Sequence, residues 1–236
     1  MKRVWTEVAV EQRPEGWVVL LDGRPLRTPA GNRLVVPGEG VARAVADEWL
    51  QVGETVNPDA MPMTRLATTV VDLMPARRDD AIAEAAGYAA TDLLCYRAET
   101  PADLAERQRQ VWQPWLDRAA DRHGAPLGVV VGVVGAAQPE ASLAALRAAV
   151  AALDDWQLVG LHAATTLTGS VVLGLAMLDG ALDADRAFDA ALLDELWEIA
   201  QWGEEEEQQR RHARLRRDLR AADRYLRLLR AAQPGG

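Results

Sequence analysis

The spacing of the apolar residues changes near residue 40, and this change limits the folds open to the chain. Before it, short β-branched runs are separated by turn signals; residues 17–21, for example, precede Asp22-Gly23, a dipeptide typical of tight hairpins. After it, Val41, Val45 and Trp49 recur at a spacing that places them on one stripe of a helix. The sequence therefore predicts an α+β fold that is mainly α. A small antiparallel β-rich domain covers residues 1–40, and a larger all-helical bundle covers residues 41–236.

The first forty residues predict a sheet of three to four strands. Residues 4–10, 17–21 and 33–37 are the candidate strands, and the prolines within 24–29 keep that segment extended. A sheet of this size buries only one face, so it must pack against another part of the chain.

Prolines, glycines and capping residues mark the expected helix ends. Pro75 is expected to end the helix that precedes it, and Asp183 is expected to cap one continuous helix that runs to Trp202. The expected helices cover residues 41–49, 64–73, 79–90, 102–122, 139–153, 183–202 and 210–230. Residues 126–135, rich in valine and glycine, indicate a buried strand or an extended connector.

Residues 158–178 require a membrane test, because they contain no Asp, Glu, Lys or Arg and are long enough to span a bilayer. Polar residues near the centre and acidic flanks argue against a span. A buried core helix, or two helices broken at Thr168-Gly169, is the favoured interpretation. The first residues lack the apolar stretch of a secretory signal, and stable membrane insertion is not expected.

Little in the sequence indicates catalysis or a cofactor. The formal net charge of −9 argues against a general nucleic-acid binder. The single cysteine, Cys95, excludes an internal disulfide and is expected to be a buried, inert thiol. None of His123, His162 and His212 has a second histidine or cysteine at ligand spacing, so no metal site is predicted, and His162 is expected in the core. No nucleotide-binding glycine pattern is present, and no cofactor is predicted.

The segment that runs from Trp197 through Trp202 and Gly203 into four glutamates, residues 204–207, is the most unusual part of the chain. The glutamates begin the last helix, where negative charge is favourable, and Glu206–Arg210 and Glu207–Arg211 are candidate i,i+4 pairs. Behind them, arginines alternate with a leucine stripe, which favours a packed helix with a solvated face over a nucleic-acid surface.

The aromatic composition is also unusual, with eight tryptophans and one phenylalanine. Trp49, Trp112, Trp115 and Trp156 lie at helical spacing among apolar neighbours and are expected in the core. Any tryptophan that stays exposed would be a candidate interface anchor.

Five short stretches, taken in order, resemble the ATP-twelve family of ATP synthase assembly chaperones, found in mitochondria and alphaproteobacteria. The stretches are residues 21–29, 48–49, 61–64, 91–97, and Trp202-Gly203 with the adjoining glutamates. The resemblance implies a small β-rich N-terminal domain and a larger helical one. It also implies a non-enzymatic chaperone that binds the unassembled α subunit of the catalytic head and shields it until the β subunit arrives.

The resemblance further implies a partner-binding site after the Trp-Gly pair. An important acidic residue of the family falls on Glu206, and Glu205, Trp202 and Gly203 complete the predicted site. No transit peptide is seen before Met1, which favours a bacterial, cytoplasmic member. The oligomeric state stays open, with a monomer favoured.

Two other functions compete with this interpretation. One is a hydrolase that uses an Asp/Glu pair in a cleft between the domains, which would need a deep pocket with carboxylates of raised pKa. The acidic pairs Asp79-Asp80 and Asp154-Asp155 stand at helix starts, where capping already explains them. The other is a nucleic-acid-binding module built on the arginine-rich last helix, which would need those arginines on one open face.

Overall fold

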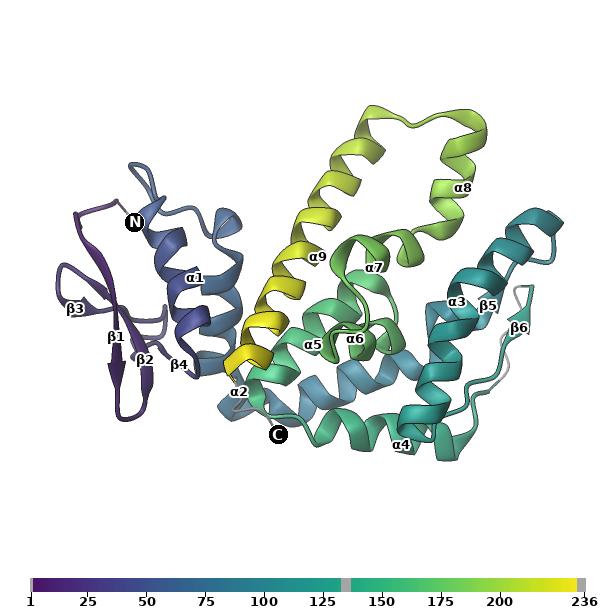
Figure 1. Ribbon diagram of the computed structural model, residues 1–236, viewed down its shortest axis with the longest axis horizontal. Coiled ribbons are helices and arrows are strands. Elements are labelled where there is room, and N and C mark those ends of the chain that lie inside the picture. Colours follow the sequence, from purple (N-terminus) through teal and green to yellow (C-terminus); the bar gives the residue numbers. More distant parts are fainter. Residues whose placement is uncertain (1, 133–136, 233–236) are drawn as a thin grey trace.

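The computed structural model describes residues 2–132 and 137–232, and it places a small sheet at one end of a mainly helical molecule (Figure 1). The sheet is antiparallel and N-terminal, and helices make up most of the chain after it. The predicted fold class is therefore confirmed.

Strand β2 (Gly16–Leu21) is the centre of the sheet, because it pairs antiparallel with β1 (Val8–Arg13), β3 (Arg24–Pro25) and β4 (Val35–Val36). The turn from β2 to β3 is the one predicted from sequence. Asp22 and Gly23 have φ angles of 48° and 74°, as a two-residue hairpin turn of the I′ type requires.

Helix α1 (Glu39–Leu50) covers the apolar face of this sheet, which meets the requirement for a packing partner. Val41 and Val45 are fully buried, and the Trp49 ring packs against Trp5 with 5.0 Å between the ring centroids. The other end of α1 approaches the last helix so closely that a Cβ atom on Gly40 would lie 2.9 Å from Leu228. The domain boundary after residue 40 stays a prediction.

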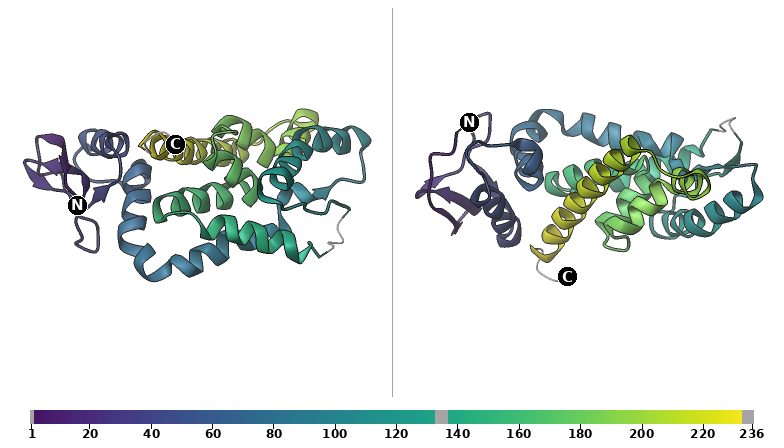
Figure 2. Two further views of the ribbon diagram at one scale, coloured as in Figure 1. Left: turned by 60° about the horizontal axis from the view of Figure 1, so that its bottom comes forward. Right: turned by 90° about the horizontal axis from the view of Figure 1, so that it is seen from above.

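Helix α2 (Pro62–Gly87) continues through Pro75, so the predicted end at this proline is wrong. A proline inside a helix costs about 3 kcal/mol, because it removes one N–H group and crowds the preceding turn. Here the helix is packed on both sides of it: Met74 and Ile82 are buried, and α2 contacts both α4 and α5. The helix accommodates the proline and bends along its length (Figure 2).

The helical part is not entirely helical. A short parallel pair joins β5 (Tyr96–Arg97) to β6 (Val130–Val131), on either side of α3 (Ala102–His123). Gly124 ends α3 in the left-handed conformation, which is typical of a glycine after a helix. Part of the predicted connector, residues 133–136, lies outside the described residues. Short 3₁₀ turns (Pro58–Ala60, Tyr88–Thr91, Leu93–Cys95) and α4 (Glu140–Ala151) complete this part of the chain.

The apolar segment tested for a membrane span forms two buried helices, α5 (Asp155–Thr168) and α6 (Val171–Leu178). The break falls where it was predicted: Gly169 has a φ of 70°, and the Ser170 side chain caps α6 by accepting from the Leu173 amide. Every helix of the described residues is too short or too polar to cross a membrane.

The helix predicted from Asp183 to Trp202 is two helices, α7 (Ala184–Ala191) and α8 (Leu193–Trp202), so the prediction of one continuous helix is wrong. Asp183 caps α7 as expected, but Leu192 departs from helical backbone angles. At this break the carbonyl of Ala190 accepts a hydrogen bond of 2.8 Å from Trp112 Nε1. A side chain of α3 thus binds a carbonyl group that, in one continuous helix, would accept a hydrogen bond from the next turn.

The last helix, α9 (Glu206–Ala232), runs back across the molecule from the end of α8 to α1 (Figure 1). Its leucine stripe is buried as predicted, with Leu219, Leu226 and Leu229 in the core. Arginines on the outer face pair with carboxylates of other elements, for example Arg220 with Asp185 of α7. This agrees with a packed helix that has a solvated, ion-paired face.

Candidate functional site

The predicted site lies at the bend between α8 and α9, and Gly203 forms the bend. Its φ of 90° and ψ of 172° lie in a region that glycine alone occupies readily. Its amide still donates to the Ile199 carbonyl at 2.8 Å, so α8 ends in an ordered way before the chain turns. A Cβ atom added here would meet nothing within 4 Å, so the demand for glycine comes from the backbone angles.

The first glutamate after the bend belongs to the fold. Glu204 Oε1 lies 2.7 Å from Nδ1 of His212, and Oε1 of Glu195 in α8 lies 2.9 Å from Nε2 of the same ring. The ring is buried and packs edge-on against Phe188. Each nitrogen of the ring therefore faces a carboxylate oxygen, one from the loop and one from α8.

Arg211 adds a further bond to the same network by pairing with Glu195. The hydrogen bond from Arg211, helped by the His212 ring, holds the pKa of Glu195 below its ordinary value. The predicted pair between Glu207 and Arg211 is therefore wrong, because Arg211 is turned toward α8. Sequence reasoning also missed the contacts of His212 with Glu204 and Glu195. These glutamates lie 8 and 17 residues before the histidine, too far for a helical spacing to indicate the contact.

The other glutamates face the solvent, Glu205 just before α9 and Glu206 and Glu207 in its first turn. Glu206 forms the predicted i,i+4 pair with Arg210 and keeps a side-chain exposure of 78%. The Glu205 amide donates to Oε1 of Gln208, and Glu205 itself is exposed. Neither Glu205 nor Glu207 has an ion pair within the described part of the chain. The bend therefore presents the exposed carboxylates of Glu205 and Glu207, together with that of Glu206, whose pair with Arg210 is also exposed.

Trp202 completes the bend with an exposed apolar surface. It is 76% exposed, and its ring meets the half-buried Trp197 ring edge-on at 6.1 Å between centroids. The predicted core tryptophans behave differently: Trp49 and Trp112 are buried, and Trp115 and Trp156 are half-buried against the core. Trp202 is thus the tryptophan with the character of an interface anchor.

Two carboxyl groups with raised pKa values lie away from this bend and support helix ends. Burial raises the pKa of Asp92 to about 6, and its oxygens accept from the amides of Leu94 and Val172. Burial also raises the pKa of Glu48, which caps α2 through the amide and hydroxyl of Thr64. Neither carboxylate lines a hollow among the described residues, so the hydrolase alternative gains no observation in its favour.

Cys95 lies where the sequence predicts it, and His162 does not. Cys95 is buried, and burial raises the pKa of its thiol to about 12, as expected for an inert cysteine. His162 is not a core residue: it is half-buried and its Nε2 atom lies 3.0 Å from Glu84 at the edge of a hollow. Within residues 2–132 and 137–232, no group of three His, Cys, Asp or Glu side chains is placed to hold a metal ion.

Residues 2–120 match the model of the family described as ATP12 chaperone protein. The chain belongs to this family. Membership supports the role of an ATP synthase assembly chaperone, because the family itself is described as one of chaperones. This family is the one that the five sequence stretches indicated.

Solved structures of the family extend the match to nearly the whole chain. Atp12 from Paracoccus denitrificans is 39% identical, covers 96% of this chain and 97% of its own, and superposes with a TM-score of 0.91. A protein from Agrobacterium tumefaciens gives the same identity and TM-score over 97% of this chain and 86% of its own. Among curated relatives, the mitochondrial atp12 protein of Schizosaccharomyces pombe is 24% identical over 86% of this chain and 74% of its own length.

Proposed function

We propose that this chaperone binds the unassembled α subunit of the ATP synthase catalytic head and shields it until the β subunit takes its place. The observation that carries the proposal is the bend, where the exposed Trp202 and the exposed carboxylates of Glu205 and Glu206 flank Gly203. A tryptophan supplies the area of an interface anchor, and carboxylates around it select a basic partner surface.

The chemistry of the bend suits a temporary contact. A holdase has to release its client, so its grip should be partly polar and of moderate affinity. Exposed carboxylates lose little by exchanging one cationic partner for another, because they remain partly solvated throughout. Glu206 already shares an exposed pair with Arg210, and this pair is easily replaced. The bacterial structural relatives favour action in the bacterial cytoplasm.

Co-expression with the α subunit alone tests the proposal. The α subunit is expected to stay soluble and to co-purify with the wild-type chain. Glu206→Lys is expected to reduce the α subunit recovered, because it places a cation where the partner's cation should lie. Glu140→Lys is the matched control, since Glu140 is also an exposed carboxylate in the first turn of a helix, α4.

Two results would count against the proposal. If co-expression with the wild-type chain gives no more soluble α subunit, the α subunit is not the client of this chaperone. Equal recovery of α subunit by wild type and Glu206→Lys would remove Glu206 from the contact.

A further inference from the structure

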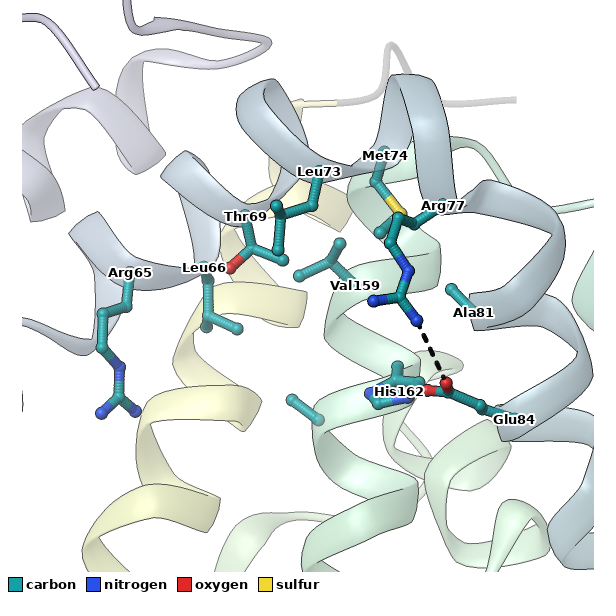
Figure 3. Close-up of a pocket in the computed structure, with 11 residues that line it drawn as sticks. Arg65, Leu66, Thr69, Leu73, Met74, Arg77, Ala81, Glu84, Val159 and His162 are labelled. Atoms are coloured by element: carbon teal, nitrogen blue, oxygen red, sulfur yellow. Dashed lines mark hydrogen bonds and ion pairs between the residues drawn. The ribbon is translucent and has the colours of Figure 1, made fainter. Parts of the chain in front are cut away.

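Three hollows adjoin one another along the outer face of α5, between α2 and α9. The first has a cavity volume of about 340 Å³ and is lined by Leu66 and His162, among others (Figure 3). The second, about 240 Å³, shares both residues and adds Ala221 of α9. The third, about 420 Å³, shares Thr166 and Leu167 with the second. The shared residues make the hollows one trough, here called the α5 groove.

The floor of the α5 groove has the shape and polarity of a helix-binding surface. Val159, Ala163 and Thr166 follow one another at helical spacing, and their small side chains allow another backbone to approach. Leucines form the walls: Leu73 on α2 is 49% exposed, and Leu215 on α9 is half-buried. In Figure 3 Leu73 and Met74 of α2 lie above Val159 of α5, and Glu84 of α2 lies beside His162 of α5.

The rim of the groove carries more positive than negative charge. Arginines 65, 77, 211 and 214 line the three hollows, against the two carboxylates of Glu84 and Asp218. This local excess contrasts with the net charge of −9 for the chain.

Two of these arginines, on opposite walls, are the least engaged. Arg65 of α2 is more than half exposed and lies 3.7 Å from the nearest carboxylate, that of Asp59. Arg214 of α9 is exposed and has no ion pair within the described part of the chain. An apolar floor between two available guanidinium groups is complementary to a helix with one apolar face and carboxylates along both edges.

We propose that the α5 groove binds an acidic amphipathic helix of the client, with the apolar face on α5 and the carboxylates on Arg65 and Arg214. This rests on the proposed function, in which the client is the unassembled α subunit. The bend at Trp202 and the α5 groove are then two separate contacts with one client, the first acidic and the second basic. Two contacts of opposite charge fix the orientation of a client better than either alone.

Photo-crosslinking within the co-purified complex locates the occupant. The crosslinking amino acid p-benzoylphenylalanine is placed at Thr166 in the groove, and at Arg107 on the exposed face of α3 as the control. The Thr166 position is expected to crosslink to one stretch of the α subunit that has apolar residues at helical spacing and flanking Asp or Glu. The Arg107 position is expected to give no such product.

Charge reversal tests the recognition itself. The double variant Arg65→Glu with Arg214→Glu is expected to weaken α-subunit binding about tenfold or more, and Arg107→Glu is expected to stay within about twofold of wild type. Thr166→Trp, which fills the floor, should weaken binding in the same way, and Thr166→Ser should not. Thermal unfolding of each variant separates loss of binding from loss of fold.

The outcomes distinguish the two proposals. If the α subunit co-purifies but Thr166 gives no crosslink to it, or crosslinks to a second copy of the chain, the groove proposal is wrong and the proposed function stands. If the Arg65→Glu, Arg214→Glu double variant binds the α subunit as tightly as wild type does, these two arginines do not recognise carboxylates of the client and the groove proposal is wrong. If the α subunit fails to bind the wild-type chain, both proposals fall together.

Discussion

Glu204 Oε1 lies 2.7 Å from Nδ1 of His212, so the first residue after the Gly203 bend is tied to the buried side of α9. The same ring reaches Glu195 of α8, and this one side chain therefore joins both helices and the loop between them. This leaves the remaining glutamates of the run to the solvent. The acidic segment has two functions: one member sets the shape of the bend, and the others line its surface.

Replacement of His212 by alanine should destabilise the protein. The Glu204 carboxylate would lose its partner and Glu195 would keep Arg211, and an unpaired, partly buried group costs about 1–3 kcal/mol. Urea unfolding measures the change. Glu204→Gln should cost less, and the double variant should cost less than the sum of the two, because both act on one network. Strict additivity would contradict the network.

The Asp92 carboxyl should make stability fall as the pH rises. Its folded pKa of about 6 lies above the ordinary 3.8, so the folded state binds the proton more tightly than the unfolded state does. The stabilisation is complete below about pH 4 and is lost as the pH passes 6. The free energy of unfolding of wild type relative to Asp92→Asn should therefore drop by about 2 kcal/mol between pH 4 and 7. A constant difference across this range would contradict the raised pKa.

Gly203→Ala should lower the free energy of unfolding, measured in urea, by about 1–3 kcal/mol, because the backbone angles of Gly203 are strained for any residue with a Cβ atom. It should also weaken α-subunit binding, since relief of the strain would turn Trp202. Gly53→Ala is the control: Gly53 is not at a positive φ, and an added Cβ atom would meet nothing. Equal stability of the two variants would show that the bend does not need glycine.

Two helical glycines should respond to alanine with opposite signs. A Cβ atom on Gly160 of α5 would lie 2.4 Å from the Leu226 side chain of α9, so Gly160→Ala should destabilise by about 1–3 kcal/mol despite the better helix propensity of alanine. Gly87, the last residue of α2, has open space around it. Gly87→Ala should stabilise by up to about 1 kcal/mol. Thermal unfolding of the two variants tests this: the midpoint should fall for Gly160→Ala and rise for Gly87→Ala, and a shift of the same sign in both would contradict the prediction.

Trp202→Ala should separate binding from stability. Because the side chain is 76% exposed, its removal should change the free energy of unfolding by less than about 0.5 kcal/mol. The dissociation constant for the α subunit should rise about tenfold or more, as for an anchor residue. Val4→Ala, at another exposed apolar side chain, is the control for both measurements. Unchanged affinity would exclude Trp202 from the contact.

Local sequence patterns predicted the features that depend on local chemistry. The Asp22-Gly23 turn, the cap at Asp183 and the break at Gly169 all arise from backbone preferences of the residues themselves. Pro75 and Leu192 could not be predicted in this way. Packing of α2 on two other helices outweighs the proline, and a hydrogen bond from Trp112 accompanies the break between α7 and α8.

The candidate site shows the same division. The exposure of Glu206 and its pair with Arg210 lie within one turn of helix, and the sequence predicted the pair. The bonds of His212 and the rim of the α5 groove depend on how α2, α5, α8 and α9 come together. Spacing along a chain carries no information about such contacts. The partner-binding role of the bend stays a prediction until a client is tested.

The close contacts of α9 also affect how the chain folds during synthesis. This helix comes later, in chain order, than the elements with which it makes its main packing contacts, α1, α2, α5, α6 and α7. Until it is made, Gly40 on the sheet side and Gly160 on the helical side both lack the partner to which their surfaces are fitted. The β-rich and helical ends of a nascent chain are therefore not fastened together through α9 before this helix has left the ribosome.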